Sequence, residues 1–147
     1  MDRSAVTARI LAAKKAKGLT FKEIADAVGR HEVWVTSAIY GQAQMDAKEA
    51  GRLVKLLDLD NEVAEALQEF SLKGSLDATV PTDPLIYRFH EITQVYGTTI
   101  KALIHEKFGD GIMSAIDFHM DIRRIADPKG DRVQITYNGK FLPYRKW

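Results

Sequence analysis

Apolar side chains recur at every third or fourth position through the first half of the chain, which is the period of an amphipathic helix. Gly18, Gly29 and Gly41 follow such stretches, where glycine commonly ends a helix. Thr20 and Glu23 have the spacing of a capping box. Five short helices are therefore predicted, over Val6 to Ala13, Phe21 to Val28, Glu32 to Tyr40, about Asp46 to Leu57, and Val63 to Phe70.

A break in this pattern divides the chain into two predicted domains. Residues 71–84 are rich in Gly, Asp, Thr and Pro, which disfavour a continued helix. We therefore expect an N-terminal helical domain over residues 1–74, a linker over 75–84 and a C-terminal domain over 85–147.

Two helices are predicted directly after the linker. Asp83 is a good N-cap, and Pro84 suits the first helical position. The first helix is expected to run to about Tyr96 with Gly97 as its C-terminal cap. A second, shorter helix is expected over roughly Thr99 to Phe108.

The pattern changes to strict alternation in the last third of the chain. Apolar and polar residues alternate from Ile116 to Arg123 and again from Val133 to Tyr137, with a turn at 127–130 between them. Asn138-Gly139 is a strong two-residue hairpin signal. The expected fold class is α+β, with a small antiparallel unit of two or three strands. So small a sheet needs packing partners, and its edges favour pairing with a second copy of the chain.

Composition narrows the choice by exclusion. The chain has 147 residues, no cysteine and a net charge of +1. Disulfides, thiolate nucleophiles and Cys-based zinc sites are excluded, and near-neutral charge offers little attraction to nucleic acid or membrane. No apolar run approaches the ~20 residues that span a bilayer, and no signal-peptide core follows Met1. A cytoplasmic protein is expected.

Three residues form the candidate site: the charged pair Arg88 and Glu91, and the hydroxyl of Ser114. Arg88 and Glu91 lie one helical turn apart among apolar neighbours, so we expect partial burial; a plain surface ion pair is the alternative. Ser114 follows a glycine-rich turn at the edge of a strand and lacks the context of a nucleophile elbow. It suits anion binding better than covalent catalysis, with backbone capping as the alternative. Together the three residues can hold small anions without a cofactor.

The histidines do not predict a metal site. His90 and His105 each precede a glutamate but lack the His-Glu-x-x-His spacing. His119 and Asp121 share one face of a strand, and two ligands are too few. We therefore expect no metal and no other cofactor.

The segment from Leu19 to Gly41 has the spacing of a helix-turn-helix motif. A recognition helix should offer basic or amide side chains to DNA, but this one carries Glu32 and Trp34, and only Arg30 and Gln42 near its ends are suitable. We expect helix-turn-helix-like geometry without nucleic-acid binding. A DNA-binding regulator with an oligomerising C-terminal domain and a purely structural oligomer module remain as alternatives.

The second half of the chain carries long, contiguous sequence matches: Pro81-Thr82-Asp83-Pro84, Tyr87-Arg88-Phe89, Gln94-Val95-Tyr96-Gly97-Thr98-Thr99, Lys101-Ala102-Leu103, His105-Glu106-Lys107-Phe108-Gly109-Asp110-Gly111-Ile112, Ser114-Ala115-Ile116 and Asn138-Gly139-Lys140. Through them the chain resembles the cyanase (cyanate hydratase, or cyanate lyase) family. The N-terminal half is similar more loosely, through Phe21-x-Glu23-Ile24-Ala25 and Gly41-Gln42. The chain departs from the family at two positions: at His90, where an aromatic residue is expected, and at Ser75, where some members have cysteine.

The resemblance implies active-site roles for Arg88, Glu91 and Ser114. It implies that bicarbonate adds to cyanate and that loss of carbon dioxide leaves carbamate, which then gives ammonia and a second carbon dioxide. It also implies a homodecamer of five dimers, with intertwined C-terminal β units and sites between subunits. An arginine fork suits such anions, Ser114 can donate hydrogen bonds, and Glu91 is best placed to orient Arg88. No nucleic acid or membrane partner is expected.

Overall fold

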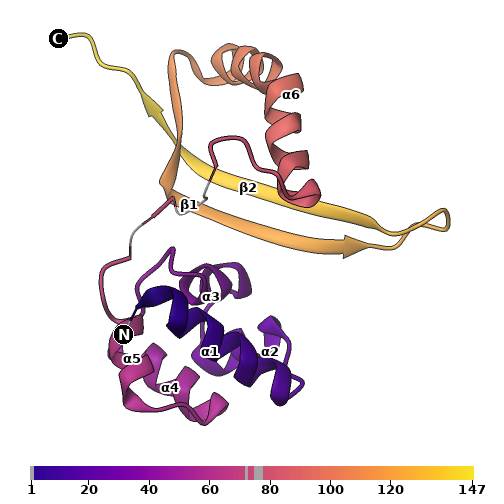
Figure 1. The fold of residues 1–147 in the computed structure, drawn as a ribbon. Helices are drawn as coiled ribbons and strands as arrows, with labels where there is room; N and C mark the ends of the chain where they lie inside the picture. The colour runs from indigo at the N-terminus through magenta and orange to yellow at the C-terminus, as the bar shows by residue number, and fades with distance from the viewer. Residues whose placement is uncertain (1, 72, 75–77) are drawn as a thin grey trace. The chain divides into compact units, whose positions relative to one another are not determined.

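Residues 2–71, 73–74 and 78–147 are described by a computed structural model, in which the chain divides into two units, Met1–Ser75 and Leu76–Trp147. Figure 1 labels the helices and strands of both units. Ser75, and with it the expected start of the linker, lies outside the described residues. Each unit is considered separately.

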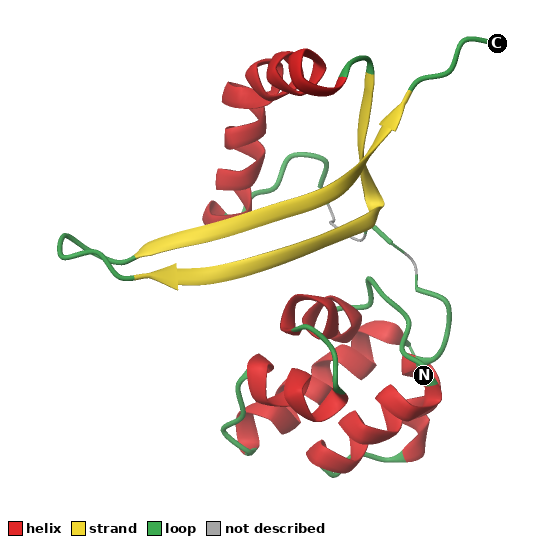
Figure 2. Cartoon of the chain, turned by 180° about the vertical axis from the view of Figure 1, so that it is seen from behind, coloured by secondary structure: helices red, strands yellow, loops and turns green. Residues whose placement is uncertain are grey.

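Unit 1 is a bundle of helices around a hydrophobic core (Figure 2). Every helix contributes a fully buried side chain, because each carries an apolar stripe at helical spacing. Examples with no exposed area are Ile10, Ile24, Ile39, Leu53 and Leu67, one from each helix in chain order. The helices are α1 (Arg3–Ala16), α2 (Phe21–Val28), α3 (Glu32–Ile39), α4 (Ala47–Leu57) and α5 (Asn61–Leu67).

Capping groups fix where these helices begin. The predicted capping box at the start of α2 is confirmed: the Glu23 amide donates to Thr20 Oγ1 at 3.1 Å, and the Thr20 amide donates to the Glu23 carboxylate at 2.7 Å. Asp46 and Glu49 form a second box before α4. The fifth helix is shorter than predicted and ends at Leu67, which leaves Phe70 outside it and 93 % exposed.

Unit 2 consists of one long helix, α6 (Pro84–Phe108), and two strands, β1 (Gly111–Ile125) and β2 (Arg132–Pro143). The α+β prediction is confirmed. The predicted division of this segment into two helices is wrong, because α6 is one helix of 25 residues and Gly97 does not adopt a positive φ. The helix does bend along its course (Figures 1 and 2). A glycine inside a helix costs only about 1 kcal/mol relative to alanine, which is too little by itself to end a helix. No described helix, α6 included, is long and apolar enough to cross a membrane.

The two strands form an antiparallel hairpin whose reversal lies at residues 126–131. Asn138-Gly139 therefore does not form the predicted hairpin turn, since both residues pair inside β2, opposite His119 and Phe118. The other predicted turn, at residues 127–130, is confirmed and makes the reversal. Gly130 has a φ of 122°, which favours glycine, and its amide donates to the Asp127 carbonyl.

A large bulge interrupts β1. Met113 pairs with Phe141 and Phe118 pairs with Gly139, so residues 114–117 stand opposite Lys140 alone. Figures 1 and 2 show β1 changing direction sharply along its course. Extra residues in one strand bend it and re-aim its side chains.

Unit 2 lacks a hydrophobic core of its own. All buried hydrophobic residues among those described lie between Val6 and Leu67, and α6 contains no buried residue. Apolar side chains are exposed along the whole of this helix: Leu85, Ile86, Tyr87, Phe89, Ile92, Val95, Tyr96, Ile100, Leu103 and Phe108. So much uncovered apolar surface is typical of a contact face rather than of a solvated one.

Candidate active site

The first turns of α6 bring Arg88 and Glu91 together. Arg88 Nη1 lies 3.0 Å from Glu91 Oε2, and the side chains are 61 % and 48 % exposed. The partial burial that we expected is not found within one chain, because the aromatic neighbours Tyr87 and Phe89 are themselves exposed. In the single chain this is a solvated ion pair of small energetic value.

The pair nevertheless leaves Arg88 able to bind an anion. Glu91 accepts from one N–H group of a guanidinium that has five such donors in a rigid fork. The remaining donors can contact a carboxylate-like ligand while Glu91 fixes the plane of the fork. Because Glu91 accepts from the guanidinium, it is suited to orienting the arginine rather than to binding an anion.

Ser114 occupies the start of the β1 bulge and is only 5 % exposed. Its Oγ accepts hydrogen bonds from the amides of Ile116, at 3.0 Å, and Asp117, at 2.9 Å. A serine hydroxyl has two acceptor lone pairs and one proton. Because both lone pairs are engaged, the hydroxyl can offer only its proton to a ligand. The capping role and the donor role expected for Ser114 are therefore compatible.

Arg88 is joined to Glu91 by a hydrogen-bonded ion pair, whereas in the described part of the chain Ser114 accepts from Ile116 and Asp117 and is not hydrogen-bonded to either residue of the pair. The three predicted site residues thus belong to two elements of unit 2, the helix α6 and the bulge of β1. No closed site is built from them within one chain.

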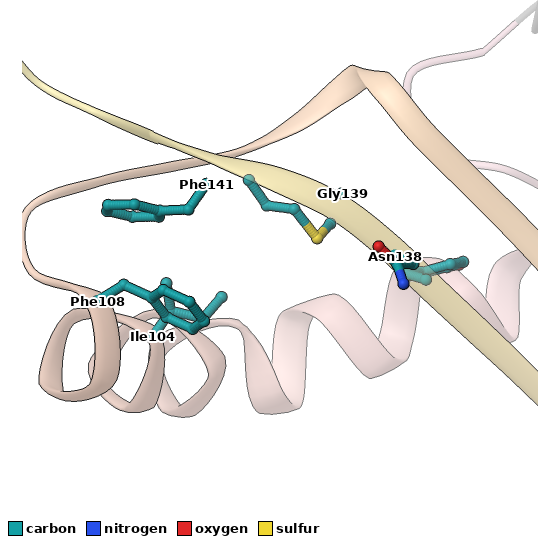
Figure 3. Close-up of a pocket in the computed structure, with 7 residues that line it drawn as sticks. Ile104, Phe108, Asn138, Gly139 and Phe141 are labelled. Atoms are coloured by element: carbon teal, nitrogen blue, oxygen red, sulfur yellow. The ribbon is translucent and has the colours of Figure 1, made fainter.

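A pocket of about 240 Å³ lies between the end of α6 and the hairpin (Figure 3). Phe108 from the helix stacks on Phe141 from β2 with ring centroids 5.2 Å apart. A second hollow of about 370 Å³ shares Ile104 and Met113 with this pocket in its lining. Both are predominantly apolar, and neither is lined by the predicted site residues, so we do not assign anion binding to them. The first is lined by Ile104, Phe108, Met113, Tyr137, Asn138, Gly139 and Phe141.

Within the described part of the chain, no three His, Asp or Glu side chains gather closely enough to hold a metal ion. Of the pair singled out on the strand, Asp121 forms an ion pair with Arg123 at 2.5 Å.

The two side chains of unit 1 that suited DNA contact have partners within the protein. Arg30 Nε donates to Glu49 Oε1 at 2.5 Å, and its guanidinium lies 5.8 Å from the Trp34 ring. This hydrogen bond raises the pKa of Arg30. Gln42 Oε1 accepts from the Gly74 amide at 2.8 Å. These contacts serve the fold of unit 1, and they give the DNA-binding alternative no support.

A helical unit followed by a helix and hairpin that carry an Arg–Glu pair and a buried serine defines a two-unit α+β protein. Two family models match it: "Cyanate hydratase, N-terminal" over residues 3–70 and "Cyanate lyase C-terminal domain" over residues 78–146. Together they span both units.

Similar proteins cover the chain almost completely. It is 60 % identical over 144 residues to the cyanate hydratase of Synechococcus sp. (strain CC9311), covering 98 % of this chain and 96 % of that protein. It is 58 % identical over 147 residues to the cyanate hydratase of Parasynechococcus marenigrum (strain WH8102), covering both completely. The crystal structure of cyanase from T. urticae matches with a TM-score of 0.83 at 40 % identity, over 94 % of this chain and 96 % of that one. The chain belongs to the cyanate lyase (cyanate hydratase) family of enzymes.

Proposed function

We propose that this protein catalyses the bicarbonate-dependent decomposition of cyanate to ammonia and carbon dioxide, with carbamate as the intermediate. The observation that carries the proposal is the match over the full chain to proteins named cyanate hydratase, at identities of up to 60 % among those compared. Arg88, Glu91 and Ser114 are the residues to which we assign the chemistry.

Arg88 binds the anions in this proposal. Both substrates are negatively charged and repel each other in water, and a guanidinium fork can hold carboxylate-like oxygens at fixed geometry. Glu91 orients the fork through the 3.0 Å contact with Nη1. Holding the two anions side by side converts a bimolecular encounter into an oriented one.

Ser114 supplies a hydrogen bond from its hydroxyl. The amides of Ile116 and Asp117 fix the position of Oγ and engage its lone pairs, so its proton is directed away from them. Such a preorganised donor can stabilise the negative charge of the adduct without reorganising during the reaction. The same two bonds argue against Ser114 as a nucleophile.

The steps balance without a metal or redox partner. A bicarbonate oxygen forms a bond to the cyanate carbon, and the bond between that oxygen and the bicarbonate carbon breaks to release carbon dioxide. With one proton taken up, carbamate remains. A second proton at the carbamate nitrogen allows its C–N bond to break, which gives ammonia and the second carbon dioxide. The residues have to bind, orient and hold charge, and bicarbonate is a co-substrate rather than a cofactor.

We further propose that the working form is a homo-oligomer, a decamer of five dimers with intertwined C-terminal units and sites between subunits. The exposed apolar surface of α6 supports assembly, because a second copy would cover it. The separate placement of the Arg88–Glu91 pair and Ser114 on two elements also fits a site completed by another chain. A cytoplasmic location and the absence of nucleic-acid and membrane partners remain predictions.

The proposal is tested by incubating purified protein with cyanate, with and without bicarbonate, and measuring ammonia. We expect ammonia release only when bicarbonate is present, with a rate that saturates as its concentration rises. Equal release in carbonate-free buffer would indicate simple hydrolysis. A metal chelator in parallel reactions should leave the rate unchanged.

A further inference from the structure

Gly139 lies where any side chain would strike the backbone that carries Ser114. A Cβ atom on Gly139 would fall closer than 3.0 Å to the Ser114 carbonyl oxygen and 2.6 Å from Cγ of Met113, approaches that real Cβ atoms essentially never show. The φ of Gly139 is not positive, so its backbone conformation does not require glycine. What requires glycine at this position is the close approach of the two strands.

This close approach occurs where β1 bulges. Gly139 pairs with Phe118 at one end of the bulge, and residues 114–117 occupy the space opposite Lys140 alone. Ser114 Oγ holds the bulge together, because it accepts hydrogen bonds from the amides of Ile116 and Asp117 within the bulge. The carbonyl that contacts Gly139 and the hydroxyl that closes the bulge belong to the same residue, so moving one moves the other.

The two contacts of a Cβ atom at position 139 differ in how easily they yield. The Met113 side chain is flexible and can change rotamer. The Ser114 carbonyl, in contrast, is part of the backbone and moves only if the bulge itself moves. Figure 3 shows Gly139 on β2 beside Asn138, at the pocket that the end of α6 faces. A Cβ atom at position 139 would therefore act mainly through the Ser114 carbonyl, because relieving that contact displaces the backbone that carries the Ser114 hydroxyl.

We propose that Gly139 is a positioning residue for the Ser114 hydroxyl. By lacking a side chain, it lets β2 support the Ser114 backbone and holds Oγ between its two amide donors. The inference rests on the proposed function insofar as Ser114 acts as the substrate donor. Its geometric part concerns the bulge alone and can be measured without any assay of activity.

The test compares Gly139→Ala, Ser114→Ala and the double variant with wild type, as the assembled protein. Gly51→Ala is the matched control, because it makes the same change in a helix where nothing lies within 4 Å of the new Cβ. Amide hydrogen exchange at Ile116 and Asp117 reports the bulge, and kcat/KM for cyanate reports the site. Size-exclusion chromatography and circular dichroism confirm that each variant is folded.

Gly139→Ala should speed exchange of the two amides by about 10-fold or more, and Gly51→Ala should not. It should lower kcat/KM by about 10-fold or more in wild type but by less than about 2-fold in the Ser114→Ala background, since residues that act through one group are not additive. Adding Met113→Ala should restore neither quantity.

Unchanged exchange in Gly139→Ala would overturn the inference, and so would equal kinetic losses in both backgrounds or rescue by Met113→Ala. Loss of the folded assembly would also contradict it, because Gly139 would then be a general structural requirement. If the wild-type protein releases no ammonia from cyanate, the proposed function fails, while the exchange measurement still decides whether Gly139 positions Ser114.

Discussion

At the scale of single residues, sequence spacing reveals the ion pair but not the environment of the serine. The contact between Arg88 and Glu91 is local in sequence, because helical geometry alone places residues three apart on one face. The burial of Ser114 depends on pairing between β1 and β2 across a bulge, which no local pattern encodes. The position of Gly139 depends on the same strand register, so the local pattern predicts a turn there instead of a paired strand residue. Its Asn-Gly context is typical of hairpin turns, and only the register shows that it sits inside a strand.

Replacing Arg88 by lysine tests whether the fork or only the charge matters. Lysine keeps the positive charge but cannot hold two oxygens in one plane. We expect kcat/KM to fall at least ~10-fold, because a charge-assisted hydrogen bond contributes about 1.5–3 kcal/mol. Thermal stability and oligomer size should stay near wild type.

Arg9→Lys is the control for that substitution. Arg9 pairs with Asp60 at 2.5 Å on the surface of unit 1, which contains none of the residues assigned to the chemistry. The control should match wild type in kinetics. Wild-type kinetics from Arg88→Lys as well would remove Arg88 from the site.

At the scale of elements, the helices of unit 1 are the best predicted part of the structure. Their stripes, caps and terminal glycines all act within a few residues of one another. The prediction failed where a distant contact outweighs a local signal, as at Asn138-Gly139, or where a weak breaker is overruled, as at Gly97. The apolar character of Phe70 fits the helical period and predicts that it belongs to the fifth helix, yet α5 ends at Leu67.

Gly97→Ala tests the continuity of α6. The new Cβ would have ordinary contact with Thr93 Cγ2 at 3.8 Å, and the position has helical φ. We expect the free energy of unfolding to rise by about 0.5–1 kcal/mol. Gly109→Ala should do the opposite, because Gly109 has a φ of 94° at the end of the helix. Denaturant unfolding of both variants measures the difference, and destabilisation by Gly97→Ala would argue for a break there.

The capping carboxylates predict how stability depends on pH. Hydrogen bonds from backbone amides, first that of Glu49 for Asp46 and that of Thr20 for Glu23, lower the pKa of both groups. A lowered pKa in the folded state means that the contribution is present above the unfolded pKa and is lost as the pH falls through the folded value. The melting temperature should therefore decrease when the pH is lowered below about 4.

Asp46→Asn isolates one of these groups. Asparagine still caps the helix through its side-chain oxygen but does not titrate there. The variant should lose little stability at neutral pH and should show a shallower decline of melting temperature in acid. A decline identical to that of wild type would show that Asp46 contributes nothing to the acid dependence.

At the scale of the whole molecule, unit 1 has a hydrophobic core of its own and unit 2 does not. Each helix of unit 1 contributes buried apolar side chains to that core, whereas α6 has no buried residue. The alternating strand pattern and the small size of the sheet predict this need for partners from the sequence alone. Which surfaces meet depends on a second chain, which no pattern within one chain specifies.

A charged residue on α6 tests that need. Val95 is 60 % exposed in the single chain, and Val95→Asp would place a charge in the surface that we expect to be covered. Sedimentation velocity should show smaller species and the assay lower activity. Gln94→Asp, one residue away at an exposed polar position, should assemble normally. A wild-type protein that sediments as a stable monomer would contradict the proposed assembly.

The central claim is that bicarbonate takes part chemically, and carbon-13 bicarbonate with unlabelled cyanate tests it most directly. Membrane-inlet mass spectrometry follows labelled and unlabelled carbon dioxide while ammonia is measured in the same reaction. The account predicts that both forms of carbon dioxide appear at equal initial rates, each matching the rate of ammonia, because one comes from bicarbonate and the other from cyanate. Unlabelled carbon dioxide alone, formed with ammonia at a rate independent of bicarbonate, would contradict it.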